Sequence, residues 1–193
     1  MAGPSRIEGY AIVSEDGMLA DAQGRIPDAL KVDADQEFFR SGLDRAAAVV
    51  HGRHSHEGPP DDTRRYRLIA TRAIAAIARD PARPRTIRWN PQGASLEEAW
   101  AALNPPTGTL AVIGGTDVYA LFLTRGYDAF HLSRVPHVRL PGGRPVFPGT
   151  GESRSPEDVL REHGLRPRPK RILDAARGVT LVSWEALKHA ASS

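Results

Sequence analysis

Two adjacent glycines, Gly114 and Gly115, follow an apolar run that ends at Ile113 and precede a helix-like segment at residues 117–123. Glycines after a buried strand let backbone amides approach a ligand that a Cβ atom would keep away. A helix that begins just beyond them offers unpaired N–H groups and the positive end of its dipole. The pattern predicts a phosphate-binding turn, and an ordinary tight turn is the alternative that the pattern alone leaves open.

A second candidate anion site follows the apolar run at residues 46–51. Gly52 ends the run, and a cation, Arg53, and a hydroxyl, Ser55, come directly after it, which suits an anionic ligand. A surface turn has the same composition. Three histidines lie close together here, His51, His54 and His56. A turn separates them and the chain has no cysteine, so the sequence does not favour a zinc site.

The predicted strand at residues 67–71 ends in a hydroxyl, Thr71, and a guanidinium, Arg72. Arginine makes bidentate contacts with phosphate, so this strand end is a third candidate for the same kind of ligand. An ordinary charge at a strand end is the alternative.

Two carboxylates, Asp33 and Asp35, lie in the first turn of a predicted helix at residues 33–44. Asp35 and Phe39 are four residues apart and therefore share a helix face. A carboxylate beside an aromatic side chain can hold a flat, nitrogen-rich ring, with a pKa set by partial burial. The alternative is an acidic first turn that only favours the helix.

The elements that must position these residues alternate along the chain, which predicts an α/β fold with a mainly parallel sheet. Residues 73–79 fit either a helix or an irregular segment, and residues 141–151 read as a loop rich in glycine and proline. Prolines at 167 and 169 prevent a helix in the basic segment 166–171, which we expect to be a solvated loop. The predicted strands are residues 7–13, 18–20, 46–51, 67–71, 86–89, 110–113, 129–135 and 179–182, and the predicted helices are residues 33–44, 95–103, 117–125 and 155–163.

Composition narrows the class of protein. The 193 residues are 40% hydrophobic, which suffices for one domain with a sizeable core. No run approaches the roughly 18 apolar residues that span a bilayer, and the first residues lack the apolar core of a signal peptide. We therefore expect a cytoplasmic protein. A small-molecule substrate and a monomeric or homodimeric state are expected from the resemblance described next. The net charge of +3 is spread along the chain without interleaved aromatic residues, so nucleic-acid binding is not expected.

Taken in order, these segments resemble the dihydrofolate reductase family over roughly residues 7–150. The resemblance implies a dihydrofolate reductase-like three-layer α/β fold, with a mainly parallel central sheet and helices on both faces, as a single domain over residues 1–193. The matching motifs are the first strand with residues 14–20, Gly-Arg-x-(Thr/Ser)-x-Glu at 52–57, the strand ending in (Ser/Thr)-Arg at 65–72, Ile-Gly-Gly-x-x-Val-Tyr at 113–119, the Leu-Thr strand at 131–134 and Phe-Pro at 147–148.

The resemblance also implies NADPH as the cofactor. The adenosine phosphates, including the 2′-phosphate, would be held by Arg53, Ser55, Thr71 and Arg72, with Gly52 and His54 in the same site. The nicotinamide would be bordered by Ile12 and Leu19. The peptide bond between Gly114 and Gly115 is expected to be cis. The pyrophosphate and the nicotinamide side would be wrapped by Gly114, Gly115, Thr116, Asp117 and Val118, with Ile113 and Tyr119 beside them.

The activity that the resemblance implies is hydride transfer to a C=N bond of a pterin-like ring. Asp35 would be the catalytic carboxylate that anchors the ring, Phe39 its stacking partner and Ser133 a hydroxyl linked to the same ring. Arg65 would bind a carboxylate on the substrate's tail. Asp33 remains a rival for the carboxylate role, because the spacing after Asp35 is one residue longer than is common.

Two departures from the family pattern keep other functions open. The usual Pro-Trp segment before the helix reads 26–30 Ile-Pro-Asp-Ala-Leu, without a tryptophan. The Ser-x-Asp-Gly sequence at 14–17 is also typical of the riboflavin-pathway reductases, which usually carry a basic residue where this chain has Met18. A reductase of a ribosylamino-pyrimidine, and a non-catalytic NADPH-binding protein, are therefore the alternatives.

Overall fold

The computed structural model describes residues 3–53, 64–151 and 153–187. Two predicted cofactor ligands, His54 and Ser55, and the neighbouring His56 lie outside the described residues. The helices are α1 (Asp33–Arg45), α2 (Leu96–Leu103), α3 (Thr116–Arg125) and α4 (Pro156–Glu162), with a short 3-10 turn, η1 (Asp28–Leu30). The strands are β1 (Arg6–Val13), β2 (Met18–Ala20), β3 (Ala48–Gly52), β4 (Arg67–Ala70), β5 (Ile77–Arg79), β6 (Thr86–Trp89), β7 (Thr109–Val112), β8 (Ala129–Arg134), β9 (Arg144–Pro145), β10 (Leu165–Pro167), β11 (Arg171–Asp174) and β12 (Val179–Ala186).

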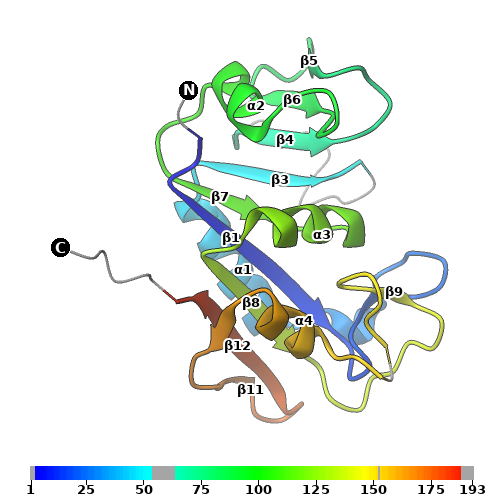
Figure 1. Cartoon of the computed structure of the whole chain (residues 1–193). Helices are drawn as coiled ribbons and strands as arrows, with labels where there is room; N and C mark the ends of the chain where they lie inside the picture. Colours follow the sequence, from blue (N-terminus) through cyan, green and yellow to red (C-terminus); the bar gives the residue numbers. More distant parts are fainter. Residues whose placement is uncertain (1–2, 54–63, 152, 188–193) are drawn as a thin grey trace.

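A large twisted sheet organises the described part of the chain (Figure 1). Its order is β10-β12-β8-β1-β7-β3-β4-β6-β5, and β11 pairs with β12 as well. The pairings from β8 across to β6 are parallel, whereas those at the two ends of the sheet are antiparallel. The sheet is therefore mainly parallel, as predicted, with antiparallel borders.

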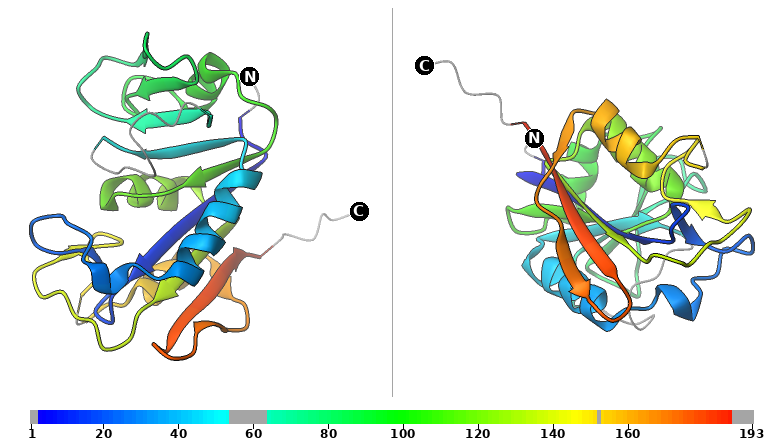
Figure 2. Two further views of the ribbon diagram at one scale, coloured as in Figure 1. Left: turned by 180° about the vertical axis from the view of Figure 1, so that it is seen from behind. Right: turned by 90° about the horizontal axis from the view of Figure 1, so that it is seen from below.

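The connections between parallel strands decide which face each helix covers. From β1 the chain passes through α1 to β3, two places to one side, and from β7 it passes through α3 to β8, two places to the other. Right-handed crossovers in opposite directions put their helices on opposite faces of the sheet. Figure 1 shows α3 and α4 in front of the sheet, and the view from behind in Figure 2 shows α1 on the other face.

The core divides along the same two faces. Neighbouring residues of a strand point to opposite sides, so Val50 packs into the core under α2, α3 and α4, while Val49 packs against α1. The strands at the centre of the sheet are apolar on both faces, which is the pattern of a buried parallel sheet. Helix α1 closes the smaller face with Leu43 and the half-buried Phe38 and Phe39.

The capping residues in the sequence predicted where α2 begins. Ser95 caps α2 through a capping box in which its hydroxyl accepts from the backbone N–H of Glu98, at 3.2 Å, while the Glu98 carboxylate accepts from the backbone N–H of Ser95. This satisfies two backbone donors that the first turn of a helix leaves without partners. The predicted helix start at Ser95 is confirmed.

Three segments that the sequence left ambiguous or predicted as loops contain short strands, because each gains a partner strand in the folded chain. Residues 77–79 form β5 against β6, and Arg144 with Pro145 forms β9 against β2. The basic segment 166–171 is not simply a solvated loop, since β10 and β11 both pair with β12. Pro167 is tolerated there because β10 lies at the border of the sheet, where a missing N–H costs least.

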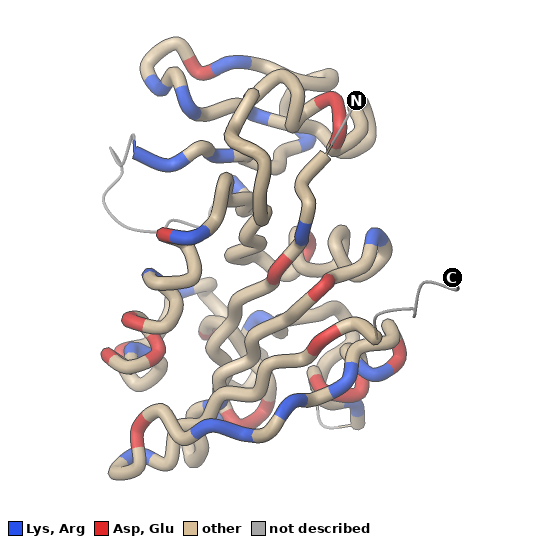
Figure 3. Tube along the Cα trace, turned by 90° about the vertical axis from the view of Figure 1, so that its left-hand side faces the viewer, with Lys and Arg blue, Asp and Glu red and all other residues tan. Residues whose placement is uncertain are grey.

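Within the described residues, no helix combines the length and the apolar character needed to cross a membrane. Charges of both signs alternate along their trace, as Figure 3 shows, without forming one basic face in that view.

Candidate active site

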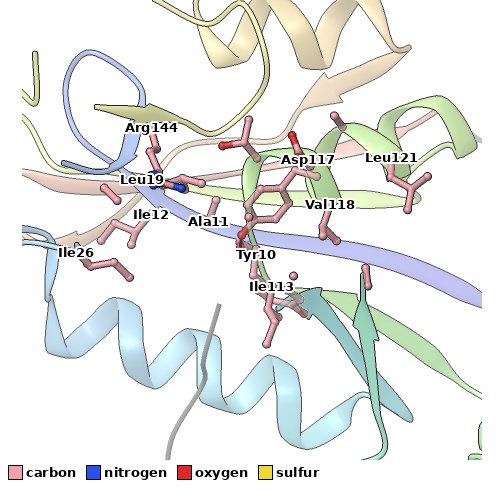
Figure 4. Close-up of a pocket in the computed structure, with 18 of the residues that line it drawn as sticks. Tyr10, Ala11, Ile12, Leu19, Ile26, Ile113, Asp117, Val118, Leu121 and Arg144 are labelled. Carbon is pink, nitrogen blue, oxygen red and sulfur yellow. Dashed lines mark hydrogen bonds between the residues drawn. The ribbon is translucent and has the colours of Figure 1, made fainter. Parts of the chain in front are cut away.

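A cavity of about 1720 Å³ opens at the carboxyl ends of β1, β3, β4 and β7. Helix α1 lines one side of it and helix α3 lines the other. Figure 4 shows the wall formed by the end of β1, with Tyr10 and Ile12, and the start of α3, with Asp117 and Val118. Open α/β sheets bind ligands at the place where neighbouring crossovers diverge, beyond the carboxyl ends of the strands.

The structure brings most of the residues predicted from the sequence to this single cavity. One predicted site residue, Asp33, is exposed and lies outside it. The residues that line it are Ile12, Leu19, Asp35, Phe39, Gly52, Arg53, Arg65, Thr71, Arg72, Ile113, Gly114, Gly115, Thr116, Asp117, Val118, Tyr119 and Ser133.

The structure therefore does not bring Asp33 to the cavity that holds the other described site residues. Asp33 is the first residue of α1, two positions before Asp35. Successive residues turn by about 100° around a helix, so two positions separate their side chains by about 200°. The helix that turns Asp35 into the cavity consequently turns Asp33 toward solvent.

The glycine turn departs from expectation in one respect. The described residues contain no cis peptide bond, so the bond between Gly114 and Gly115 is trans. The chain reverses instead through positive φ angles, 137° at Gly114 and 60° at Gly115, which glycine adopts without the clash that a Cβ atom brings. The carbonyl of Gly114 accepts from the backbone N–H of Gly52 at 3.1 Å, which ties the turn to the end of β3. The correction removes one feature on which the expected nicotinamide pocket depended.

Helix α3 begins at this turn with its N-terminus facing the cavity. Gly115 occupies the N-cap position, and no side chain caps that end of the helix. Arg72 reaches across from the end of β4 and lies 3.8 Å from the carboxylate of Asp117, with both side chains largely exposed. An exposed pair at this distance is worth little, so an anion can draw the Arg72 guanidinium away at small cost.

The deep polar groups of the cavity are Asp35 and Ser133. Burial raises the pKa of Asp35, and the nearby hydroxyl of Ser133 lowers it by less. Ser133 Oγ is fully buried, yet within the described residues no partner meets hydrogen-bond geometry with it. A carboxylate held in a poorly solvated wall beside an unsatisfied hydroxyl is suited to bind N–H groups of a ligand.

The charges that line the cavity are mainly basic. The carboxylates on its wall are Asp35 and Asp117. Arg65 is fixed by a 2.6 Å bond from its Nη2 to Oδ1 of Asp44, on the last turn of α1. Such an imbalance attracts anionic ligands. The cations are Lys31, Arg40, Arg53, Arg64, Arg65, Arg72 and Arg144.

Sequence reasoning missed several residues of the cavity wall. Tyr10 and His131 lie two positions before Ile12 and Ser133 on the same strands, so the two-residue period of a strand could have identified them. Phe38 also lines the cavity, from the helix that carries Asp35. No local signal points to Arg144, because only the pairing of β9 with β2 brings it to the cavity.

No protein-family model and no curated protein matches the chain at the sequence level. Solved structures do match. A riboflavin biosynthesis protein from Shewanella sp. PV-4 aligns with a TM-score of 0.66 and 16% identity, over 95% of this chain and 99% of that one. Dihydrofolate reductase from Enterococcus faecalis, complexed with NADP(H), aligns with a TM-score of 0.63 and 13% identity, over 96% and 98% of the two chains.

A third similar structure comes from a longer protein. The diaminohydroxyphosphoribosylaminopyrimidine deaminase/5-amino-6-(5-phosphoribosylamino)uracil reductase of Thermotoga maritima aligns with a TM-score of 0.65 and 15% identity, over 96% of this chain and 57% of that chain. These likenesses establish the fold, which is that of dihydrofolate reductase and the riboflavin-pathway proteins. The predicted fold class is confirmed.

Proposed function

We propose that this chain is an NADPH-dependent reductase that delivers a hydride to a C=N bond of dihydrofolate or a related pterin. The observation that carries the proposal is the position of Asp35. Its carboxylate faces the same cavity as the glycine turn and Arg72, although these groups come from three separate parts of the chain. A reductase of this kind needs a carboxylate that binds the substrate's ring and a turn that binds the cofactor's phosphates.

The size of the cavity supports two ligands. Sites for a single drug-sized molecule usually measure about 300–1,000 Å³. The cavity here, about 1720 Å³, is larger than that range. Cofactor and substrate can therefore lie side by side, as hydride transfer requires.

The residues at the outer part of the cavity fit NADPH. The uncapped start of α3 and the glycine turn offer backbone N–H groups to a pyrophosphate. Arg72 and Arg53 offer charged donors for the adenosine phosphates, and Ile12 and Leu19 offer an apolar surface to the nicotinamide. NADPH, when bound, would supply the hydride.

The deep part of the cavity fits a flat heterocycle. Asp35 would accept hydrogen bonds from the ring's amino and N–H groups, while Phe39 would stack on the ring. Reduction of a C=N bond consumes one proton as well as the hydride. The ionised form of Asp35 would favour the protonated form of the bound ring, and burial, which raises the pKa of Asp35, strengthens the affinity of the carboxylate for that proton.

One observation favours a second candidate, the reduction of a ribosylamino-pyrimidine that carries a sugar phosphate. The sequence has Met18 where riboflavin-pathway reductases usually have a basic residue. Pairing of β9 with β2 nevertheless places Arg144 opposite Ala20, and its side chain lines the cavity (Figure 4). This guanidinium supplies a cation near the site at which a sugar phosphate would need one.

These functions can be tested by measuring NADPH oxidation with three substrates in turn. The substrates are dihydrofolate, a dihydropterin without a tail, and the riboflavin-pathway pyrimidine. We expect turnover of dihydrofolate. Arg65→Lys should lower the activity toward dihydrofolate more than the activity toward the tail-less dihydropterin. Turnover of the pyrimidine alone, lost in Arg144→Ala, would support the second candidate. Binding of NADPH without turnover of any of the three would contradict both and favour a non-catalytic protein.

A further inference from the structure

A polar cluster lies beside the proposed substrate site and has no part in the function described so far. It consists of Arg6, Glu8 and Tyr10 on β1, His131 on β8 and Ser183 on β12. Tyr10 and His131 also line the cavity. The cluster therefore reaches from the interior of the sheet face under α1 to the cavity wall.

His131 has a neighbour at each ring nitrogen, a hydrogen-bond partner at Nδ1 and a more distant carboxylate at Nε2. Nδ1 lies 2.8 Å from the hydroxyl of Ser183, which is its direct partner in the strand register, and Nε2 lies 3.6 Å from Oε2 of Glu8. Glu8 Oε2 also accepts from the Tyr10 hydroxyl at 2.7 Å. The imidazole side chain is only 15% exposed, so these contacts fix the orientation of the ring rather than cover a mobile surface group.

The arrangement is compatible with either charge state of the imidazole. Ionised Glu8 can only accept, so it selects the form that carries a proton on Nε2. The Ser183 hydroxyl can donate to a bare Nδ1 or accept from a protonated one. The His131 ring therefore keeps both partners whether or not it carries a second proton.

The fixed imidazole in turn contacts the aromatic wall of the cavity. Its centroid is 4.7 Å from that of Tyr10 and 5.3 Å from that of Phe38, which meets it edge-on. Phe38 lies on α1, three residues after Asp35, and three-residue neighbours share a helix face. The imidazole thus links β8 to the aromatic part of the wall that α1 contributes to the cavity.

The charged groups around this contact come from every element packed against it. Arg6 pairs with Glu8 on β1. Glu185 on β12 accepts a hydrogen bond from Arg168, which is the main cause of its lowered pKa, and Arg6 and His131 contribute less. The guanidinium of Arg171 on β11 lies 5.6 Å from the ring centre of Phe38, and Asp35 is the carboxylate that α1 contributes to the cavity. None of these charges replaces the direct contact that His131 makes with Phe38.

We propose that His131 is a positioning residue of the reductase site: held between Glu8 and Ser183, its ring sets the Tyr10 and Phe38 wall against which the substrate's flat ring binds. The role rests on the proposed function. It concerns binding of the ring and not the hydride step, so it acts equally on the bound substrate and on the transition state. Removal of such an interaction raises KM and leaves kcat unchanged.

Kinetics with dihydrofolate test this role. Because aromatic contacts of this kind are worth a modest factor each, we expect His131→Leu to raise KM about three- to tenfold. In the same variant kcat and the Kd for NADPH should stay within about twofold of the native values. His131→Gln, which keeps groups able to bond to Glu8 and Ser183, should recover part of the loss. His163→Leu, at the exposed end of α4, is the matched control and should leave KM unchanged.

A pH titration of the Glu8 carboxyl, followed by carbon-13 NMR, tests the cluster without any measurement of turnover. The His131 ring is the largest cause of the lowered pKa of Glu8, which is about 2. Loss of the ring in His131→Leu should therefore raise the pKa of Glu8, although Arg6 and Tyr10 still lower it, so the carboxyl should take up its proton at a higher pH than in the native protein.

Three results would overturn the inference. The first is an unchanged KM in His131→Leu. The second is a change of the same size in kcat, KM and NADPH affinity in that variant. The third is a Glu8 titration curve that is the same in the variant and in the native protein. A native protein that turns over none of the candidate substrates refutes the proposed function instead, and the cluster is then judged on the Glu8 titration and on the NMR signals of Phe38, which must move in His131→Leu.

Discussion

At the scale of single residues, the feature that matters most is the choice between two carboxylates in one helical turn. Both are aspartates, and the sequence favours Asp35 through its spacing from Phe39 while it keeps Asp33 as a rival. Burial separates them, because Asp35 lines the cavity with a raised pKa while Asp33 is exposed at the start of α1. The two residues form a matched pair for mutagenesis.

Asp35→Asn preserves the shape of the side chain and removes its charge. General acid–base assistance is worth about 10²–10⁴ in rate, so turnover should fall by about that factor while the Kd for NADPH stays near the native value. Asp33→Asn should leave both quantities unchanged. The reverse pattern, measured by NADPH oxidation and by fluorescence titration of the cofactor, would assign the role to Asp33.

Asp35→Asn should also change the stability of the folded protein, and the size of that change should depend on pH. A carboxyl group whose folded-state pKa is raised destabilises the folded state once it ionises. Below the ordinary pKa of aspartate both states are protonated and no penalty exists; the penalty develops as the pH rises through the raised value. Asp35→Asn should therefore have a higher Tm than the native protein at neutral pH, with the difference vanishing in acid. A difference that grows in acid would contradict the raised pKa.

At the scale of elements, the site depends on how closely α1 packs on β1. Gly42 of α1 lies over the ring of Tyr10, and a Cβ atom there would come within 2.6–2.7 Å of Tyr10 ring atoms. Glycine is unfavourable inside a helix, so its presence here is explained by the close approach and not by local preference. The contact sets the distance between the helix that carries Asp35 and the strand that forms the cavity floor.

Gly42→Ala should therefore destabilise the protein although alanine is the better helix former. Overpacking costs about 1–3 kcal/mol and helix propensity returns about 1 kcal/mol, so we expect a net loss of up to about 2 kcal/mol in thermal or urea unfolding. Combined with Tyr10→Leu, which removes the ring, the substitution should no longer destabilise, giving a positive coupling in the double-mutant cycle. Additive effects of the two changes would show that the helix shifts without strain. Ser41→Ala, at an exposed neighbouring position, serves as the control.

At the scale of the whole molecule, the cavity collects strand ends from across the sheet, from β1 and β8 to β4. Any ligand that binds there contacts segments that separate when the protein unfolds. Binding energy is therefore added directly to the free energy of unfolding, and thermal stability reports on cofactor choice.

NADPH should stabilise the protein more than NADH does, because Arg72 would face the 2′-phosphate through a charge-assisted bond. A concentration one hundred times Kd adds about 2.7 kcal/mol, which corresponds to about 5–10 °C in Tm for a chain of this size. Arg72→Ala should reduce the NADPH shift to that of NADH, whereas Arg88→Ala, an exposed arginine outside the cavity, should not. Equal shifts for the two cofactors in the native protein would refute the assignment of Arg72.

The sequence by itself determined the helices, most of the strands, the fold class and the groups of residues that end up at one cavity. These features depend on local information: apolar periodicity, capping residues such as Ser95, and polar residues placed directly after strands. Parallel strands bring their carboxyl ends to one edge of the sheet, so residues such as Thr71 and Gly114 meet once the order of elements is known.

Only the tertiary structure decided the remaining features. Burial selects Asp35 over Asp33, strand pairing brings Arg144 beside β2, and the register of β8 with β12 joins His131 to Ser183 across 52 residues. Strands β5, β9, β10 and β11 are short and depend on a partner strand for their hydrogen bonds. That partner is the next strand along the chain for β5 and β11, and the distant β2 for β9. The pattern within such a short segment does not determine its pairing, since the free energy that selects it comes from contacts with another strand.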